Sequence, residues 1–330
     1  MTDAIAFTPA TSVEPAQDRG RLVKGIVFGL IASTIGGTFL AFSRAGLTQS
    51  GLGTAEIAFL RLGIAGLVFL PWLIWKWRDF RQQMTLMDVL LYVTLIGPPF
   101  AIICISGYYF APLVHGAVFL PGSLLIFGTA ISAVLLGKPI DRVKKASIAV
   151  ICVGFVLIAA PGFIAAGPKV LVGDVLFLWS GAQWAAFAAL VGKRGTDPAL
   201  AVASLSVFSL FVYCPLYLAM FGTEIFAAIP PATLALNALI HGLMAGAIAV
   251  LSYSLCVGYL GSGPAALFPA LVPILTLVIG IPLTGEWLSA TEWLAVAIIA
   301  GGLMASVRVW ERLDSLKAAW ARRPGGKDRA

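Results

Sequence analysis

Apolar runs of membrane-spanning length follow one another along nearly the whole chain. The hydrocarbon core of a bilayer is about 30 Å thick, so a helix needs about 20 mainly apolar residues to cross it. The composition agrees, because only 11% of the residues are charged, whereas soluble domains carry about 25%. The runs do not alternate apolar and polar residues as the strands of an outer-membrane barrel would. The sequence therefore predicts an all-α integral membrane protein.

Ten apolar runs have the length of a transmembrane helix, and short polar loops separate them. Almost all of the mass is therefore expected to lie within the bilayer. The predicted spans cover residues 22–44, 55–75, 86–109, 112–136, 143–162, 173–192, 199–221, 233–257, 263–284 and 290–309.

Small residues and prolines recur at an offset of 148 residues, which indicates that one membrane unit is used twice. Five predicted spans fall in each half, and with an odd number the second copy must sit upside down relative to the first. Inverted repeats of this kind are the ground plan of many secondary transporters. We predict five-helix repeats at 22–165 and 166–310, with a disordered cytoplasmic tail at 1–21 and another cytoplasmic tail at 311–330. The recurring pairs are Gly25 and Gly173, Pro121 and Pro269, Gly137 and Gly285, and Gly154 and Gly302.

The positive charges of the loops predict the orientation, since lysine and arginine concentrate in cytoplasmic loops. With the N-terminus inside, 19 of the 22 lysines and arginines fall on the cytoplasmic side, so both termini are predicted to be cytoplasmic. Arg44 and Lys169 then lie outside, and Arg61 lies within a span. The cations behind the net charge of +7 are thus expected in cytoplasmic loops and tails, so we do not predict a nucleic-acid partner. We expect a multi-pass protein of the plasma or inner membrane.

Three segments together carry a resemblance to a known family: AFLRLGIAGLVFLP in the second span, YYFAPLVHGAVFLPG leading into the fourth, and ALFPALVPILTLVIGIPLTGEWLS in the ninth. Over residues 22–310 the chain resembles the ten-helix EamA-type members of the drug/metabolite transporter superfamily. The resemblance implies a transporter of small metabolites, often an exporter of amino acids or drugs. One departure is Lys138, which stands where the first half of the pattern has a glutamate.

Arg61 is a single cation within an otherwise uncharged stretch, in the outer half of the second span. A buried arginine at the centre of a membrane helix costs about 2.5–3.5 kcal/mol on insertion scales and usually faces the protein interior or a wet cavity. Its planar guanidinium suits a substrate carboxylate or phosphate. A structural arginine, paired with Glu56 or with backbone carbonyls, is the alternative. Both interpretations stay open at the level of sequence.

Other polar side chains at membrane depth are candidates for lining a substrate cavity. The two histidines could also respond to protons near neutral pH. Trp184 lies at mid-span, away from the tryptophans of the expected interfacial belt. Hydrogen bonding between helices is the alternative role for such groups. With Arg61, the candidates for substrate binding are His115, Ser123, Gln183, Trp184, Asn237 and His241.

Prolines interrupt the third, fourth and ninth spans. Proline removes a backbone donor and kinks a helix, and the freed carbonyls can bind a ligand or provide a hinge. A static kink is the alternative. The candidate hinges are Pro98, Pro99, Pro121, Pro269 and Pro273.

A secondary transporter that works by alternating access around a central cavity is the leading functional prediction. The sequence has no Walker A motif, so the energy is expected from a gradient or from exchange. The rivals are an intramembrane enzyme and a non-transporting assembly subunit. The sequence shows no GxSxG or HExxH motif, and the prediction assigns no catalytic residue, metal or cofactor. The expected partners are a small-molecule substrate and the lipid bilayer.

Overall fold

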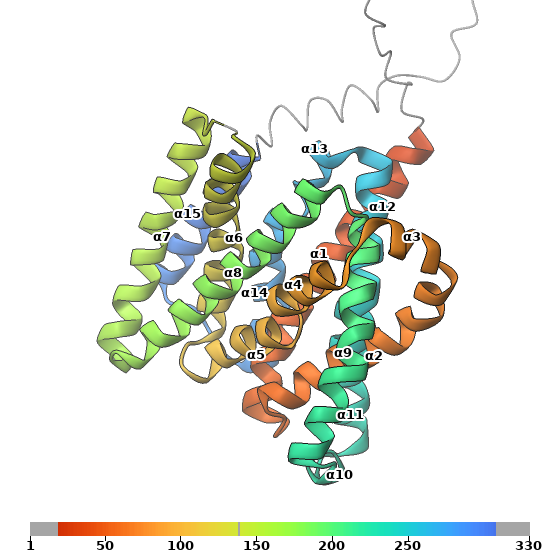
Figure 1. The fold of residues 1–330 in the computed structure, drawn as a ribbon. Helices are drawn as coiled ribbons and strands as arrows, with labels where there is room; N and C mark the ends of the chain where they lie inside the picture. The colour runs from red at the N-terminus through yellow and green to blue at the C-terminus, as the bar shows by residue number, and fades with distance from the viewer. Residues whose placement is uncertain (1–18, 138, 308–330) are drawn as a thin grey trace, which may run out of the picture.

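Helices build all of the regular structure in the computed structural model, which describes residues 19–137 and 139–307 (Figure 1). No strand occurs within those two ranges. The first half of the chain contains α1 (Arg19–Gln49), α2 (Thr54–Trp75), α3 (Trp77–Gln83), α4 (Leu86–Ile96), α5 (Pro98–Ser106), the 3-10 helix η1 (Gly107–Tyr109), α6 (Leu113–Leu136) and α7 (Arg142–Ala166). The second half contains α8 (Lys169–Arg194), α9 (Pro198–Phe221), α10 (Glu224–Ala228), α11 (Pro231–Asn237), the π-helix η2 (Ala238–Ile248), α12 (Ala249–Leu260), α13 (Ser262–Ala265), the 3-10 helix η3 (Pro269–Leu271), α14 (Val272–Thr284) and α15 (Ala290–Ser306).

Eight helical segments among the described residues are long and apolar enough to cross a membrane, and they match the first eight predicted spans. Two further apolar helices are shorter, at Pro269–Thr284 and Ala290–Ser306. The ninth predicted span is divided into α13, η3 and α14 because prolines along it remove backbone donors. The all-α prediction is confirmed, and the lengths and composition of the helices fit a multi-pass membrane protein.

The prolines predicted as kinks differ in what they do to the helices. Gly97 separates α4 from α5, and Pro98 and Pro99 open α5, where a missing N–H is tolerated. Pro121 lies inside α6, which continues through it. Pro269 begins η3. The predicted interruption of the third span is therefore confirmed, whereas a hinge role for any of these prolines stays a prediction.

The boundaries of the predicted tails are partly covered. α1 begins at Arg19 and so includes the last residues of the segment predicted as a disordered tail at 1–21. Residues 1–18, Lys138 and the predicted tail at 311–330 lie outside the described residues.

Long helices from opposite halves of the chain pack against each other. α1 lies against α12 and α14, and α8 lies against α5 and α6. α2 packs on α9 and η2, and α7 packs on α15. We call the end of the bundle with the turn after α14 the Glu286 end, and the end with the turn after α8 the Arg194 end. In Figure 1, α10 at the bottom marks the Glu286 end and α13 at the top marks the Arg194 end.

Glycines set the spacing where α7 meets α15. A Cβ atom added to Gly154 would lie 2.3 Å from Ile299, and one added to Gly302 would lie 2.8 Å from Ile151. Small residues of this kind let membrane helices approach closely. The pair α7–α15 therefore depends on glycine from both of its helices.

Candidate functional site

The contact between α2 and η2 brings Arg61 and His241 together. A Cβ atom on Gly242 would lie 2.6 Å from the Cβ of Ile64, and one on Gly246 would lie 3.0 Å from the carbonyl oxygen of Arg61. These two glycines are four residues apart and let η2 lie directly against α2. η2 is a π-helix, in which each N–H bonds to the carbonyl five residues earlier, and π segments are frequent at functional sites.

The guanidinium of Arg61 lies among aromatic rings. Its Cζ atom is 4.5 Å from the ring centroid of Phe39 on α1 and 5.7 Å from that of Phe100 on α5. Both distances allow cation–π attraction. The Nη1 atom is buried and has no hydrogen-bond partner, although the residue as a whole is only half-buried. Part of Arg61 therefore borders accessible space while one of its donors is unsatisfied.

His241 contributes a second polar group from η2. Its side chain is fully buried, and its ring meets Phe39 edge to face at 5.6 Å between centroids. Neither ring nitrogen meets hydrogen-bond geometry with a protein atom, although the backbone of Phe42 lies near one of them. Arg61 lies within electrostatic range of His241. Two polar side chains with unmet hydrogen-bonding capacity thus share one aromatic neighbour.

Trp184 extends the same cluster from α8. Its ring meets Phe100 edge to face at 5.4 Å between centroids, and 36% of the residue is exposed. The preceding Gln183 is buried, donates from Nε2 to the carbonyl oxygen of Thr94 at 3.3 Å, and leaves Oε1 without a partner. The Arg61 cluster, as we define it, consists of Arg61, His241, Phe39, Phe100 and Trp184.

Sequence-predicted residues divide between this cluster and other places. Arg61, Trp184 and His241 come together, and Gln183 is next to Trp184 in the chain. His115 pairs with Asp174 between α6 and α8, with Nδ1 and Oδ1 2.6 Å apart and both side chains buried.

Ser123 and Asn237 also lie outside the Arg61 cluster. Ser123 donates to the carbonyl oxygen of Leu120 at 2.9 Å and sits where a Cβ atom on Gly181 would be. Asn237 donates to the carbonyl oxygen of Thr233 at 2.9 Å. The contacts of Ser123 are those of helix packing, whereas the buried Oδ1 of Asn237 has no hydrogen-bond partner. A substrate role for both residues stays a prediction.

One of the alternatives for Arg61 is wrong. Glu56 does not pair with Arg61, because its Oε1 accepts a hydrogen bond from the hydroxyl of Tyr217 at 2.6 Å. The structure also encloses a buried carboxylate, Asp174, in α8, which begins at Lys169. The partners of these acids are far away in sequence, which is why the sequence did not reveal them.

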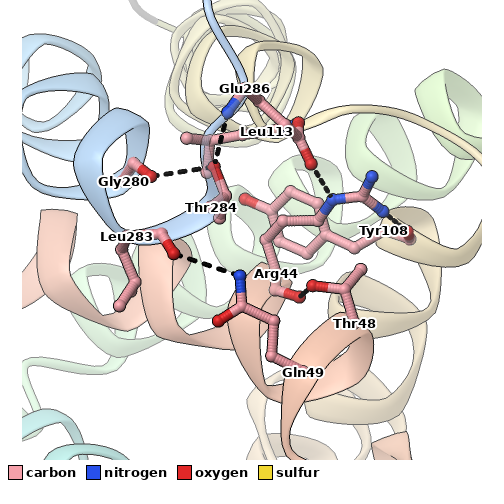
Figure 2. Close-up of polar contacts among 9 residues, drawn as sticks. All are labelled: Arg44, Thr48, Gln49, Tyr108, Leu113, Gly280, Leu283, Thr284 and Glu286. Carbon is pink, nitrogen blue, oxygen red and sulfur yellow. Dashed lines mark hydrogen bonds and ion pairs between the residues drawn. The ribbon is translucent and has the colours of Figure 1, made fainter.

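An ion-pair network at the Glu286 end was also missed, and Figure 2 shows it. Arg44 Nε lies 2.6 Å from Glu286 Oε1, and Arg44 Nη1 donates to the carbonyl oxygen of Tyr108. The backbone N–H of Leu113 donates to the other carboxylate oxygen at 2.7 Å. Gln49 Nε2 donates to the carbonyl oxygen of Leu283 at 3.1 Å. The network joins α1, η1 and α6 to the turn after α14.

A different set of contacts joins the halves at the Arg194 end. Arg194 Nη1 lies 2.6 Å from Oδ1 of Asp88 at the start of α4. Asp88 also accepts from the backbone N–H and hydroxyl of Thr85, which caps α4. The backbone N–H of Asp197 donates to Gln83 at 3.1 Å. Within residues 19–137 and 139–307, no group of three or more metal-ligating side chains occurs at either end or between them.

Comparison with known proteins supports the fold. No protein-family model matches the sequence, and no curated protein matches it. A solved structure described as "Crystal structure of protein" is similar, with 19% sequence identity and a TM-score of 0.56. The match covers 90% of this chain and 99% of that chain. At this identity the likeness shows the fold alone, and it spans nearly the whole of both chains.

Proposed function

We propose that the protein is a ten-span secondary transporter of small metabolites, of the EamA type in the drug/metabolite transporter superfamily. The observation that carries the proposal is the unpartnered Nη1 of Arg61, held among groups from both halves of the chain. Phe39 and Phe100 come from the first half, and Trp184 and His241 come from the second. A half-buried cation with one buried and unmet donor, among residues of both halves, suits the binding of a solute.

Contacts between the halves support two inverted repeats. The offset of 148 residues relates Gly154 to Gly302 and Ile151 to Ile299. Gly154 lies against Ile299, and Gly302 lies against Ile151. Exchanging the two halves therefore turns one contact into the other, as a twofold axis between inverted repeats requires.

A second exchange involves the helices next to the Arg61 cluster. The same offset relates Gly37 to Ala185 and Gly128 to Thr276. A Cβ atom on Gly37 would lie 2.8 Å from the backbone nitrogen of Thr276, and one on Gly128 would lie 3.9 Å from the Cβ of Ala185. The packing of α1 on α14 thus corresponds to the packing of α8 on α6. This correspondence supports counting α14 and α15 as the ninth and tenth spans despite their shorter length.

Separate contacts at the two ends of the bundle support alternating access, which requires that each end can open while the other stays closed. Arg44 and Glu286 join the halves at one end, and Arg194 and Asp88 join them at the other. Opening one set while the other holds gives the Arg61 cluster access to one side at a time. The distribution of loop cations supports placing the Arg194 end in the cytoplasm. The family resemblance favours export of amino acids or drug-like compounds, driven by a gradient or by exchange.

Transport by purified protein in sealed vesicles tests this proposal. Vesicles are loaded with a defined metabolite mixture, and the solutes inside and outside are followed by mass spectrometry. We expect at least one solute to cross unaltered, and Arg61→Gln to slow it roughly tenfold or more because a charge-assisted contact is lost. Arg81→Gln, at an exposed position on α3, is the matched control and should leave the rate unchanged.

Two outcomes would count against transport, and a third would count against the site. Folded wild-type protein that moves no solute is not a transporter of the mixture offered. A solute that is chemically altered points to the intramembrane enzyme instead. Equal transport rates for Arg61→Gln and Arg81→Gln would show that the solute does not depend on Arg61 to cross.

A further inference from the structure

We propose that the Arg61 cluster binds a monoanion with an aromatic body and no amine, such as an arylalkyl carboxylate. This inference rests on the proposed function, since it names the class of solute for the same site. Three features of the cluster carry it: the charge around Arg61, the geometry of its guanidinium, and the aromatic rings beside it.

The balance of charge argues against an amine on the solute. The cluster contains a guanidinium and no carboxylate. Glu56 lies on α2 and Asp174 lies on α8, the helices that carry Arg61 and Trp184. Glu56 accepts a hydrogen bond from Tyr217, and Asp174 pairs with His115. A solute ammonium group would therefore meet a buried cation with no counter-charge. The ammonium group of an amino acid would be repelled by the guanidinium, whereas a carboxylate without an amine has no such group.

The geometry of Arg61 favours a single negative charge. A guanidinium presents parallel N–H donors that match the two oxygens of a carboxylate, and Nη1 is buried with no protein acceptor. One carboxylate neutralises one guanidinium. A phosphate dianion carries one negative charge more than the guanidinium, the permanently charged group of the cluster, can neutralise.

The surroundings of Arg61 favour an aromatic body. Phe39 and Phe100 flank the guanidinium, and Trp184 meets Phe100 edge to face while keeping 36% of its surface exposed. An exposed part of an indole beside a ring pair offers an edge or face on which a further ring can stack. A short aliphatic acid would satisfy Arg61 but would not reach the exposed part of Trp184.

Binding of four related compounds to purified protein in nanodiscs tests the inference. The compounds are 3-phenylpropionate, phenylalanine, 2-phenylethylamine and propionate, measured by isothermal titration calorimetry at neutral pH. Phenylalanine differs from 3-phenylpropionate by one ammonium group, and propionate differs from it by the ring. We expect 3-phenylpropionate to bind at least roughly tenfold more tightly than each of the others.

Variants assign the two parts of the solute to residues. Arg61→Lys keeps the charge and loses the fork, so 3-phenylpropionate should bind more weakly, and Arg61→Gln should weaken it further. Trp184→Ala should weaken 3-phenylpropionate and leave propionate unchanged. Arg81→Gln should bind like the wild type, and the unfolding temperature of each variant verifies that it is folded.

The inference is overturned if phenylalanine or 2-phenylethylamine binds as tightly as 3-phenylpropionate, or if 3-phenylpropionate does not bind. It is also overturned if folded Arg61→Lys and Arg61→Gln bind it normally. Flux in sealed vesicles separates this result from the proposed function. If a solute crosses and 3-phenylpropionate does not compete with it, the protein is a transporter but the anion site is rejected. If 3-phenylpropionate binds but no solute crosses, the anion site is supported and the transport function is rejected.

Discussion

The two ends of the bundle are joined by different kinds of contact. At the Glu286 end, one carboxylate takes Arg44 on one oxygen and a backbone N–H on the other, and the two charged side chains are 19% and 27% exposed. At the Arg194 end, Asp88 is 2% exposed but its partner Arg194 is 42% exposed. An ion pair weakens as water reaches it. The comparison teaches that the two ends of one bundle can be joined by ion pairs of unequal exposure.

The positions 148 residues away from Arg44 and Glu286 carry different residue types. Arg44 corresponds to Gly192, and Glu286 corresponds to Lys138. A glycine and a lysine cannot form an ion pair. The Arg194 end uses another pair of helices, α8 and α4, for its charged contact. If the two halves are repeats, as proposed, they share packing positions but not these charges.

The largest expected effect concerns which end faces outward. Single cysteines at Gly51 and Gly167 lie at the Glu286 end, and single cysteines at Asp79 and Asp197 lie at the Arg194 end. A membrane-impermeant maleimide added to intact cells should label the first two and leave the last two unlabelled, because the cations gather at the Arg194 end. The experiment uses a background without the native cysteines. Labelling of Asp79→Cys from outside would reverse the orientation.

A smaller effect is expected when the network of Figure 2 is broken. Glu286→Ala removes the acceptor for Arg44 and Leu113, so we expect a loss of about 2 kcal/mol in the free energy of unfolding. Thermal unfolding in detergent measures it, with Glu224→Ala as the control at the same end. Glu224 is exposed on α10, so its substitution should change little. Equal unfolding temperatures for the two variants would show that the network contributes nothing to stability.

The smallest effect is expected at the opposite end. Arg194→Gln removes an exposed partner of Asp88, and exposed ion pairs are typically worth about 0–1 kcal/mol. The acid keeps its hydrogen bonds to Thr85, so α4 should remain capped. The same unfolding measurement should therefore show a smaller shift than for Glu286→Ala. A larger shift would invert the comparison between the two ends.

Much of the fold was predictable because apolar length and proline chemistry act locally. The third span illustrates this, since Pro98 and Pro99 cannot donate hydrogen bonds and the helix is interrupted just before them. The Glu286 network was not predictable, because Arg44 and Glu286 are 242 residues apart in the chain. Only the packing of α1 on α14 brings them together.

The sequence predicted the polar part of the candidate site but not its aromatic part. Arg61 stands out in the sequence because a cation in an apolar span is rare. Phe39 and Phe100 do not, because a phenylalanine in an apolar run resembles any core residue. Asp174 was overlooked because its partner His115 is 59 residues away in the chain, and only the packing of α8 on α6 buries the two side chains together. Burial of this kind depends on tertiary packing.

The π-helix η2 contains more residues than an α-helix of the same length would. Each turn closed by bonds to the fifth residue holds more residues than a turn closed by bonds to the fourth. Deleting one residue between His241 and Ile248 can be absorbed by a return toward ordinary α geometry, which leaves both His241 and α12 near their places. The same deletion in a regular α-helix would turn the residues before it by about 100° relative to those after it, the angle per residue of an α-helix. In η2, a change in the number of residues therefore alters the hydrogen-bond pattern of a turn before it alters the direction of His241.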